Sequence, residues 1–144
     1  MRMESLEPKK FNGRSHVDGR GVLRFNNHVD LTQFKRSYSI ENSSENPMRG
    51  WHGHKFESKG FLCIRGKVRI GGVQVDDWKN PSSTLHVFKE DLDANSMDFV
   101  FLPAGFANAI MSLESGSIVL VFSSSTLEDS QNDDYRYAPE TWLL

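Results

Sequence analysis

Short runs of alternating apolar and polar residues cover most of the chain between residues 21 and 122. Successive side chains of a strand point to opposite faces, so a period of two predicts half-buried strands. In 61–70, one face collects Leu62, Ile64, Val68 and Ile70, and Gly66 indicates a bend or bulge in that run. The predicted strands are 21–25, 36–40, 51–56, 61–70, 73–75, 85–92, 99–102 and 118–122.

The segments between these runs are polar or contain Gly and Pro. They predict loops at 41–47 and 77–84 and a tight turn starting at Pro103. No helix is predicted before Leu127, and the tail is expected to form a short helical or irregular cap over 128–144. Many short strands with Gly and Pro turns favour an all-β sandwich or barrel, and 144 residues suit one domain, 1–144.

Composition narrows the class of protein. The net charge is −2, and Lys and Arg are scattered along the chain, whereas a nucleic-acid-binding protein usually carries a basic stripe; no nucleic-acid partner is expected. Cys63 is the single cysteine, which excludes an intrachain disulfide and favours a reducing compartment. No apolar run approaches a membrane span, and the first residues do not resemble a signal peptide, so we expect a cytoplasmic protein without membrane contact.

The segment RGWHGHKFESK, from Arg49 to Lys59, carries the clearest chemical signal. His52 and His54 are two residues apart on a predicted strand, so both imidazoles lie on one face. Such a pair has three uses: binding a metal, general acid–base catalysis, or hydrogen bonding within a sheet.

The metal alternative rests on spacing. A His-x-His pair followed by Glu and by Pro-x-Gly-x-x-His resembles the ligand set of metal-binding cupins. Here Glu57 follows His54 more closely than in those proteins, and Asn108 stands where the last His belongs. An amide is a poor replacement for an imidazole ligand, so we predict no metal.

The acid–base alternative needs a base and a cation. A positioned imidazole can remove a proton next to a ketone if a cation stabilises the enolate oxygen. Imidazole titrates near neutral pH and can return the proton. Three cations, Arg36, Arg49 and Lys59, lie close enough in sequence to serve the enolate or a diphosphate.

Several motifs resemble known families. DGRGVL from Asp18, KRSY from Lys35 and RGWHGHK from Arg49 resemble, in order and spacing, the sugar 3,4-ketoisomerase branch of the cupins. Lys59 and the segment LPAGFAN from Leu102 resemble the dTDP-4-keto-6-deoxyhexose 3,5-epimerases. The resemblance implies a single cupin (jelly-roll) β-barrel that acts without a cofactor.

The resemblance also implies roles. His52 is expected to take the proton next to the C4 ketone and Lys59 to stabilise the enolate oxygen. His54 and Tyr38 match positions that handle protons. The expected substrate-binding residues are Arg20, Arg36, Arg49 and Asn108.

Two departures keep the reaction open. The epimerases carry a late-strand Tyr where this chain has Phe122, for which Tyr38, Tyr135 or Tyr137 could substitute, and Asn108 replaces a His. Epimerisation of a nucleotide-linked 4-keto-6-deoxy sugar at C3, or at C3 and C5, is the first prediction. Sugar 3,4-ketoisomerisation is the alternative, followed by a non-catalytic sugar-binding cupin and a metal-dependent cupin enzyme.

The resemblance finally implies partners. A nucleotide sugar is the expected ligand. Cupins of this kind are usually homodimers that often exchange an N-terminal strand, a role predicted here for an N-terminal arm over residues 1–15.

Overall fold

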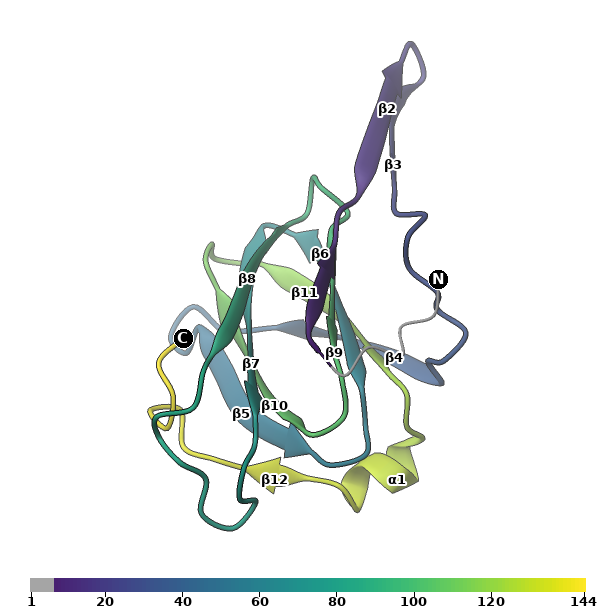
Figure 1. Ribbon diagram of the computed structural model, residues 1–144. Helices are drawn as coiled ribbons and strands as arrows, with labels where there is room; N and C mark the ends of the chain where they lie inside the picture. The colour runs from purple at the N-terminus through teal and green to yellow at the C-terminus, as the bar shows by residue number, and fades with distance from the viewer. Residues whose placement is uncertain (1–6) are drawn as a thin grey trace.

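The computed structural model describes residues 7–144, which form two five-stranded antiparallel sheets facing each other (Figure 1). The first sheet has the order β1 (Lys9–Phe11), β9 (Phe99–Leu102), β6 (Lys59–Arg65), β11 (Ile118–Ser123) and β4 (Arg36–Glu41). The second has the order β12 (Tyr135–Arg136), β5 (Met48–His54), β10 (Phe106–Ser112), β7 (Lys67–Gln74) and β8 (Phe88–Asp93). The all-β jelly-roll prediction is confirmed, although the described sheets are not joined by strand pairing into a closed barrel.

The main hydrophobic core lies between the two sheets. Phe61, Val100 and Val121 come from the first sheet, and Ile70 and Ile110 come from the second. All five are at most 3% exposed. Removing their apolar surface from water is the main stabilising contribution to this sandwich.

The prediction of one strand over 61–70 is wrong. Gly66 adopts a positive φ of 70° and connects β6 to β7, so the run is split into two strands. The face that points inward changes at this turn. Cys63 is therefore buried in the core, while Ile64, predicted on the apolar face, is 49% exposed.

Strand β10 was missed by the sequence analysis. Its first residues, Phe-Ala-Asn-Ala, follow directly on the predicted turn and include residue types with low strand propensity. Pairing with β5 on one side and β7 on the other makes this segment a central strand. The strand predicted over 85–92 begins later, at Phe88.

The outer face of the second sheet is covered by the C-terminal segment. The predicted cap 128–144 contains most of helix α1 (Leu127–Gln131), strand β12 and an irregular tail. Trp142 packs edge-on against Trp51 at 5.3 Å between ring centroids, and the Trp51 indole Nε1 donates to the Trp142 carbonyl oxygen. The tail thereby buries Trp51 completely.

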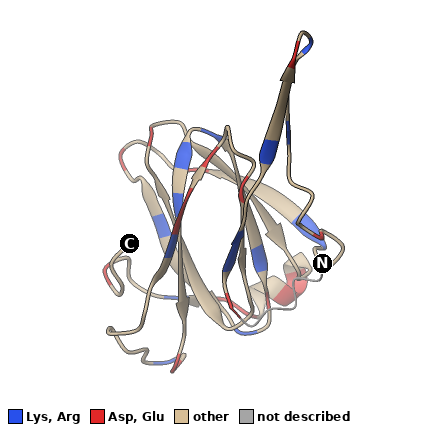
Figure 2. Cartoon of the chain, turned by 45° about the horizontal axis from the view of Figure 1, so that its top comes forward, with Lys and Arg blue, Asp and Glu red and all other residues tan. Residues whose placement is uncertain are grey.

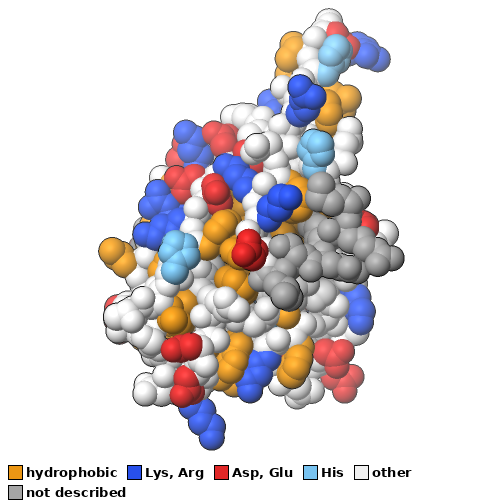
Figure 3. Space-filling view, viewed as in Figure 1, with side chains coloured by type: hydrophobic (Ala, Val, Ile, Leu, Met, Phe, Trp, Pro, Cys, Tyr) orange, Lys and Arg blue, Asp and Glu red, His pale blue; other side chains and the backbone are white. Residues whose placement is uncertain are grey.

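A β-hairpin projects from the sandwich (Figure 1). It consists of β2 (Arg14–Asp18) and β3 (Gly21–Phe25). Its side chains Val17, Val22 and Leu23 are exposed, and hydrophobic atoms are visible on the hairpin in Figure 3. Residues 1–6 of the predicted N-terminal arm lie outside the described residues.

Charged residues of both signs are distributed over the strands and loops (Figure 2). Within residues 7–144, no helix is long and apolar enough to cross a membrane.

Candidate active site

Strand β5 places the two predicted catalytic imidazoles inside the sandwich. His52 pairs with Asn108 and His54 with Phe106 of β10, whose even-numbered side chains share the face of the core residue Ile110. Trp51 and Gly53 face the opposite side, toward the C-terminal tail and Trp78. The predicted shared face of His52 and His54 is therefore present.

His54 is buried and held in one tautomer. Its Nδ1 lies 2.6 Å from the backbone oxygen of Asp133. A carbonyl can only accept, so Nδ1 carries the proton and Nε2 keeps its lone pair; Nε2 has no hydrogen-bond partner among the described residues. Burial lowers the pKa of His54, Lys59 lowers it further, and Glu57 opposes both. His54 is therefore neutral at neutral pH and able to accept a proton.

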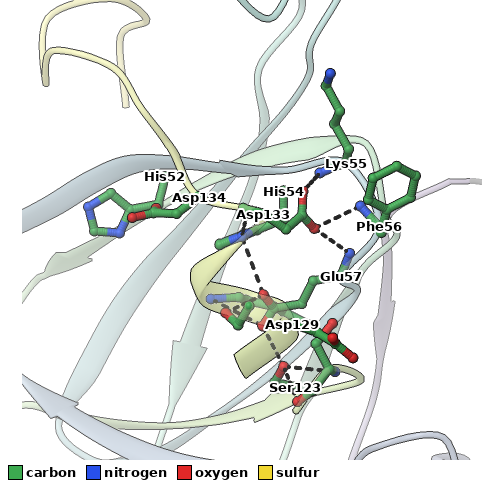
Figure 4. Close-up of polar contacts among 12 residues, drawn as sticks. His52, His54, Lys55, Phe56, Glu57, Ser123, Asp129, Asp133 and Asp134 are labelled. Carbon is green, nitrogen blue, oxygen red and sulfur yellow. Dashed lines mark hydrogen bonds and ion pairs between the residues drawn. The ribbon is translucent and has the colours of Figure 1, made fainter. Parts of the chain in front are cut away.

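His52 is half-buried beside the C-terminal strand (Figure 4). Burial is the main cause that lowers the pKa of His52, and Arg136 adds to it, while Asp134 acts in the opposite direction. The Asn108 side chain donates from Nδ2 to the His52 backbone oxygen at 3.2 Å. Asn108 thus supports the strand that carries His52.

Lys59 and Tyr38 form a hydrogen-bonded pair from the first sheet. The Lys59 Nζ donates to the Tyr38 hydroxyl oxygen at 2.8 Å, and Lys59 is only 8% exposed. The guanidinium of Arg36 lies over the Tyr38 ring at 5.1 Å. Tyr38 pairs with the core residue Val121, which places its ring on the inner face of the sheet.

The loop between β5 and β6 is fixed from the C-terminal side (Figure 4). Both carboxylate oxygens of Asp133 accept backbone N–H groups, from Lys55 at 2.7 Å, Phe56 at 2.9 Å and Glu57 at 3.1 Å. Hydrogen bonds from three N–H groups to one carboxylate are strong because the acceptor is charged. They hold the loop that joins the imidazoles to Lys59.

One group of side chains has the composition of a metal site. The ligand atoms of His54, Glu57 and Asp133 lie within 4.8 Å of one another. However, Asp133 already accepts three N–H groups, His54 donates from Nδ1 to a carbonyl, and Glu57 accepts two hydroxyl groups. His52 lies outside this group, so the residues fit a hydrogen-bonded network better than the metal set considered from spacing.

Two predicted arginines lie apart from this cluster. Arg20 is at the tip of the projecting hairpin, with an 89% exposed side chain paired to Asp18 at 2.7 Å. Arg49 is exposed but pairs with Ile110, because a bulge at Trp51 shifts the register of β5. The bulge therefore turns Arg49 toward the same sheet face as His52.

The interpretation of Phe122 as a catalytic tyrosine that has lost its hydroxyl is wrong. Its ring packs 5.7 Å from both Phe34 and Phe99, on the outer face of the first sheet. The neighbouring β11 residues Val121 and Ser123 face inward instead. Among the three tyrosines considered as substitutes, Tyr38 faces the interior, whereas Tyr137 packs with Trp142 and Tyr135 with Trp78.

The C-terminal segment contributes residues to the site that were not among the predicted site residues. Arg136 pairs with His52 in the sheet, and its Nε lies 3.1 Å from an Asp134 carboxylate oxygen. Asp133 holds the loop beside His54. The only signal was the short segment DDYR, a weak match to the acidic-Tyr-Ile-Arg tail of the sugar 3,4-ketoisomerases.

A cavity of about 430 Å³ continues the inner face of the second sheet. Its lining includes Gly72, Gln74, Leu85, His86, Phe88 and Phe106. Gly72 pairs with Asn108, which pairs with His52, so the backbone of Gly72 lies two strands, or about 10 Å, from the backbone of His52. The lining of this cavity does not include His52 or His54.

Comparisons with known proteins agree with this fold. The family model described as "FdtA: WxcM-like, C-terminal" matches residues 9–143. No protein with a curated description matches the chain.

Similar solved structures are sugar-modifying enzymes. The rmlC epimerase of Mycobacterium tuberculosis has a TM-score of 0.75 at 16% identity, covering 96% of this chain and 72% of that one. A variant of the 3,4-ketoisomerase QdtA from Thermoanaerobacterium thermosaccharolyticum, in complex with TDP-4-keto-6-deoxyglucose, has 0.67 at 16%, covering 93% and 90%. The 3'-monoepimerase ChmJ from Streptomyces bikiniensis has 0.71 at 18%, covering 96% and 74%. The predicted cupin fold is confirmed, and the chain belongs to the WxcM-like, C-terminal (FdtA) family.

Proposed function

We propose that this protein is an isomerase that moves a proton next to the ketone of a nucleotide-linked 4-keto-6-deoxy sugar. The observation that carries the proposal is the pair His52 and His54, both with lowered pKa values, on the inner face beside Lys59 and Tyr38. Neutral imidazoles are bases, and a buried ammonium can stabilise an enolate. The QdtA variant in complex with TDP-4-keto-6-deoxyglucose supports the substrate class.

In this mechanism, His52 takes the proton from C3. The C–H electron pair forms a C3–C4 double bond, and the C4 oxygen becomes an enolate that Lys59 stabilises. No cofactor takes part in this step. His54 has an unprotonated Nε2 and can exchange protons with the same intermediate.

Ketone migration from C4 to C3 is the reaction that the geometry favours. It requires the intermediate to gain a proton at C4 and on its C4 oxygen and to lose the proton of the C3 hydroxyl. His52 and His54 project from one strand toward one side of a bound sugar, which suits exchange on one face. Substrate contacts from Arg36, Arg49 and Asn108 remain part of the proposal.

Epimerisation at C3, or at C3 and C5, is the second candidate. It requires a proton donor on the other side of the sugar ring. Tyr38 comes from the opposite sheet and carries a hydroxyl within 2.8 Å of Lys59 Nζ, which favours it for that role.

The proposal includes a homodimer in which the hairpin packs against a second copy. An isolated two-stranded hairpin is marginally stable in water, and Val17 and Val22 lie opposite each other on one exposed face of it. A second copy would also give Arg20 a nucleotide to contact. Light scattering of wild type and Val17→Lys tests this: a dimer that becomes a monomer supports it, and a wild-type monomer contradicts it.

The function is tested by incubating the protein with TDP-4-keto-6-deoxyglucose in D₂O and following deuterium and the carbonyl position by NMR. A 3-keto product supports ketone migration, and a C3 epimer supports the second candidate. Saturable binding without exchange, in wild type and His52→Asn alike, would leave a sugar-binding cupin.

A further inference from the structure

Glu57 lies in the loop between β5 and β6 and has no exposed side-chain surface. Its carboxylate is enclosed by protein atoms, so it is not placed to contact a substrate directly. From sequence, Glu57 is a candidate only for a metal ligand. Its surroundings point to another use.

Two hydroxyl groups fix the carboxylate. Ser130 of helix α1 donates from Oγ to Oε1 at 2.7 Å, and Ser123 of β11 donates from Oγ to Oε2. Each oxygen therefore has its own neutral donor from a different element. These two hydrogen bonds alone fix the orientation of the carboxylate plane.

Three charged or protonatable side chains of the proposed reaction meet this carboxylate. His54 Nδ1 lies 3.3 Å from Oε1, Arg36 Nη2 lies 3.5 Å from Oε2, and Lys59 Nζ lies 3.8 Å from Oε2. They come from β5, β4 and β6. One buried anion is thus shared by groups of both sheets.

The carboxylate is charged in the folded protein. Burial alone would raise the pKa of Glu57, but Lys59, the hydroxyls of Ser123 and Ser130, and His54 together lower it. A buried anion that balances several cations is strongly destabilising to remove because the cations lose their compensation. The cations facing Glu57 are Arg36 and Lys59, and His54 joins them when it accepts a proton. The Asp133 carboxylate is a second anion, with an oxygen within 4.8 Å of the Glu57 carboxylate.

We propose that Glu57 is a positioning residue: it holds Lys59 and His54 in fixed relation and stabilises the imidazolium that forms when His54 accepts a proton. The inference rests on the proposed function for its kinetic consequence. The role proposed for Glu57 can also be detected without substrate, because removing this anion makes protonation of His54 less favourable and so lowers the His54 pKa.

The test compares wild type with Glu57→Gln, which keeps the shape of the side chain and removes the charge. We expect kcat for solvent proton exchange with TDP-4-keto-6-deoxyglucose to fall about 10- to 100-fold, with KM changed less than about threefold, because the acting groups lose their alignment. Histidine-ring NMR titration should show a lower pKa for His54 and a smaller change for His52. The acid limb of the rate profile should move to lower pH.

A matched control is Asp91→Asn. Asp91 is an ion-paired carboxylate on the surface, 2.8 Å from Arg69 Nε, and its loss changes the net charge by the same amount. Both kcat and the His54 titration should stay at wild-type values in this variant.

Unchanged kcat and an unchanged His54 titration in Glu57→Gln would overturn the proposal and leave Glu57 as a packed polar residue. If that variant does not fold, Ser130→Ala decides: loss of one fixing hydroxyl should reduce kcat about 3- to 10-fold, and no reduction would overturn the proposal. Absence of exchange in wild type would reject the proposed function, while the His54 titration would still test Glu57.

Discussion

The two faces of β5 are built from alternate residues of one strand but have different surroundings. The outer face presents Trp51, which is fully buried against Trp142. The inner face presents the half-buried His52 and the buried His54, whose Nε2 has no hydrogen-bond partner among the described residues. A strand with a period of two can therefore bury one set of residues in a hydrophobic cluster and present the other set, here the proposed catalytic imidazoles, on the opposite face.

The C-terminal segment completes both faces. Trp142 covers the outer side, while Asp133 receives hydrogen bonds beside His54 on the other. Substitutions on the inner face should consequently reduce activity, whereas substitutions on the outer face should reduce the free energy of unfolding.

The largest effect is expected from His52→Asn. Loss of a general base reduces the rate of proton transfer about 10²- to 10⁴-fold. The free energy of unfolding should change by less than about 1 kcal/mol because the His52 side chain makes no hydrogen bond to another residue of 7–144 and is half-buried. Deuterium exchange and urea denaturation measure the two quantities; an equal loss of stability would contradict the separation of the faces.

Trp51→Ala should have the reverse effect. Removing a buried aromatic ring costs about 3–5 kcal/mol of unfolding free energy because the cavity is not refilled. The indole also loses its hydrogen bond to the Trp142 carbonyl oxygen. Urea denaturation gives the loss, and Trp51→Phe is the control, for which a smaller loss is expected.

The sequence predicts the alternation on β5 but not what lies opposite each face. His52 and His54 were identified because their spacing alone places them together. The hydrogen-bonded positions of Glu57 and Asp133 were not predicted, since these hydrogen bonds join residues 66 to 78 positions apart. Phe122 was misinterpreted because an all-apolar strand does not show which of its faces points inward.

Gly53→Ala should have an intermediate effect on stability and little on activity. A Cβ at this position would lie 2.8 Å from a Trp78 ring carbon and 3.3 Å from Tyr137. Overpacking of this kind costs about 1–3 kcal/mol. Thermal denaturation checks the loss, and a kcat reduced as strongly as in His52→Asn would show that the outer face also sets the chemistry.

The smallest expected effect is the response of wild type to mild acid. Burial lowers the pKa values of His52 and His54 below the ordinary 6.5, so the unfolded chain binds more protons than the folded one as the pH falls through that value. The free energy of unfolding is therefore fully retained above pH 6.5 and decreases below it. Urea denaturation between pH 7.5 and 5.5, with His52→Asn for comparison, should show a weaker decrease in the variant.

The hydrogen bonds of Asp133 also impose an order on biosynthesis. The loop that it holds is translated 76 to 78 residues earlier. At about 5–20 residues per second, the ribosome needs roughly 4 to 15 s to synthesise the residues between this loop and Asp133. During this time the backbone N–H groups of the loop between His54 and Lys59 have no Asp133 carboxylate to donate to. The loop can therefore reach its final hydrogen bonding only after most of the strands have been synthesised.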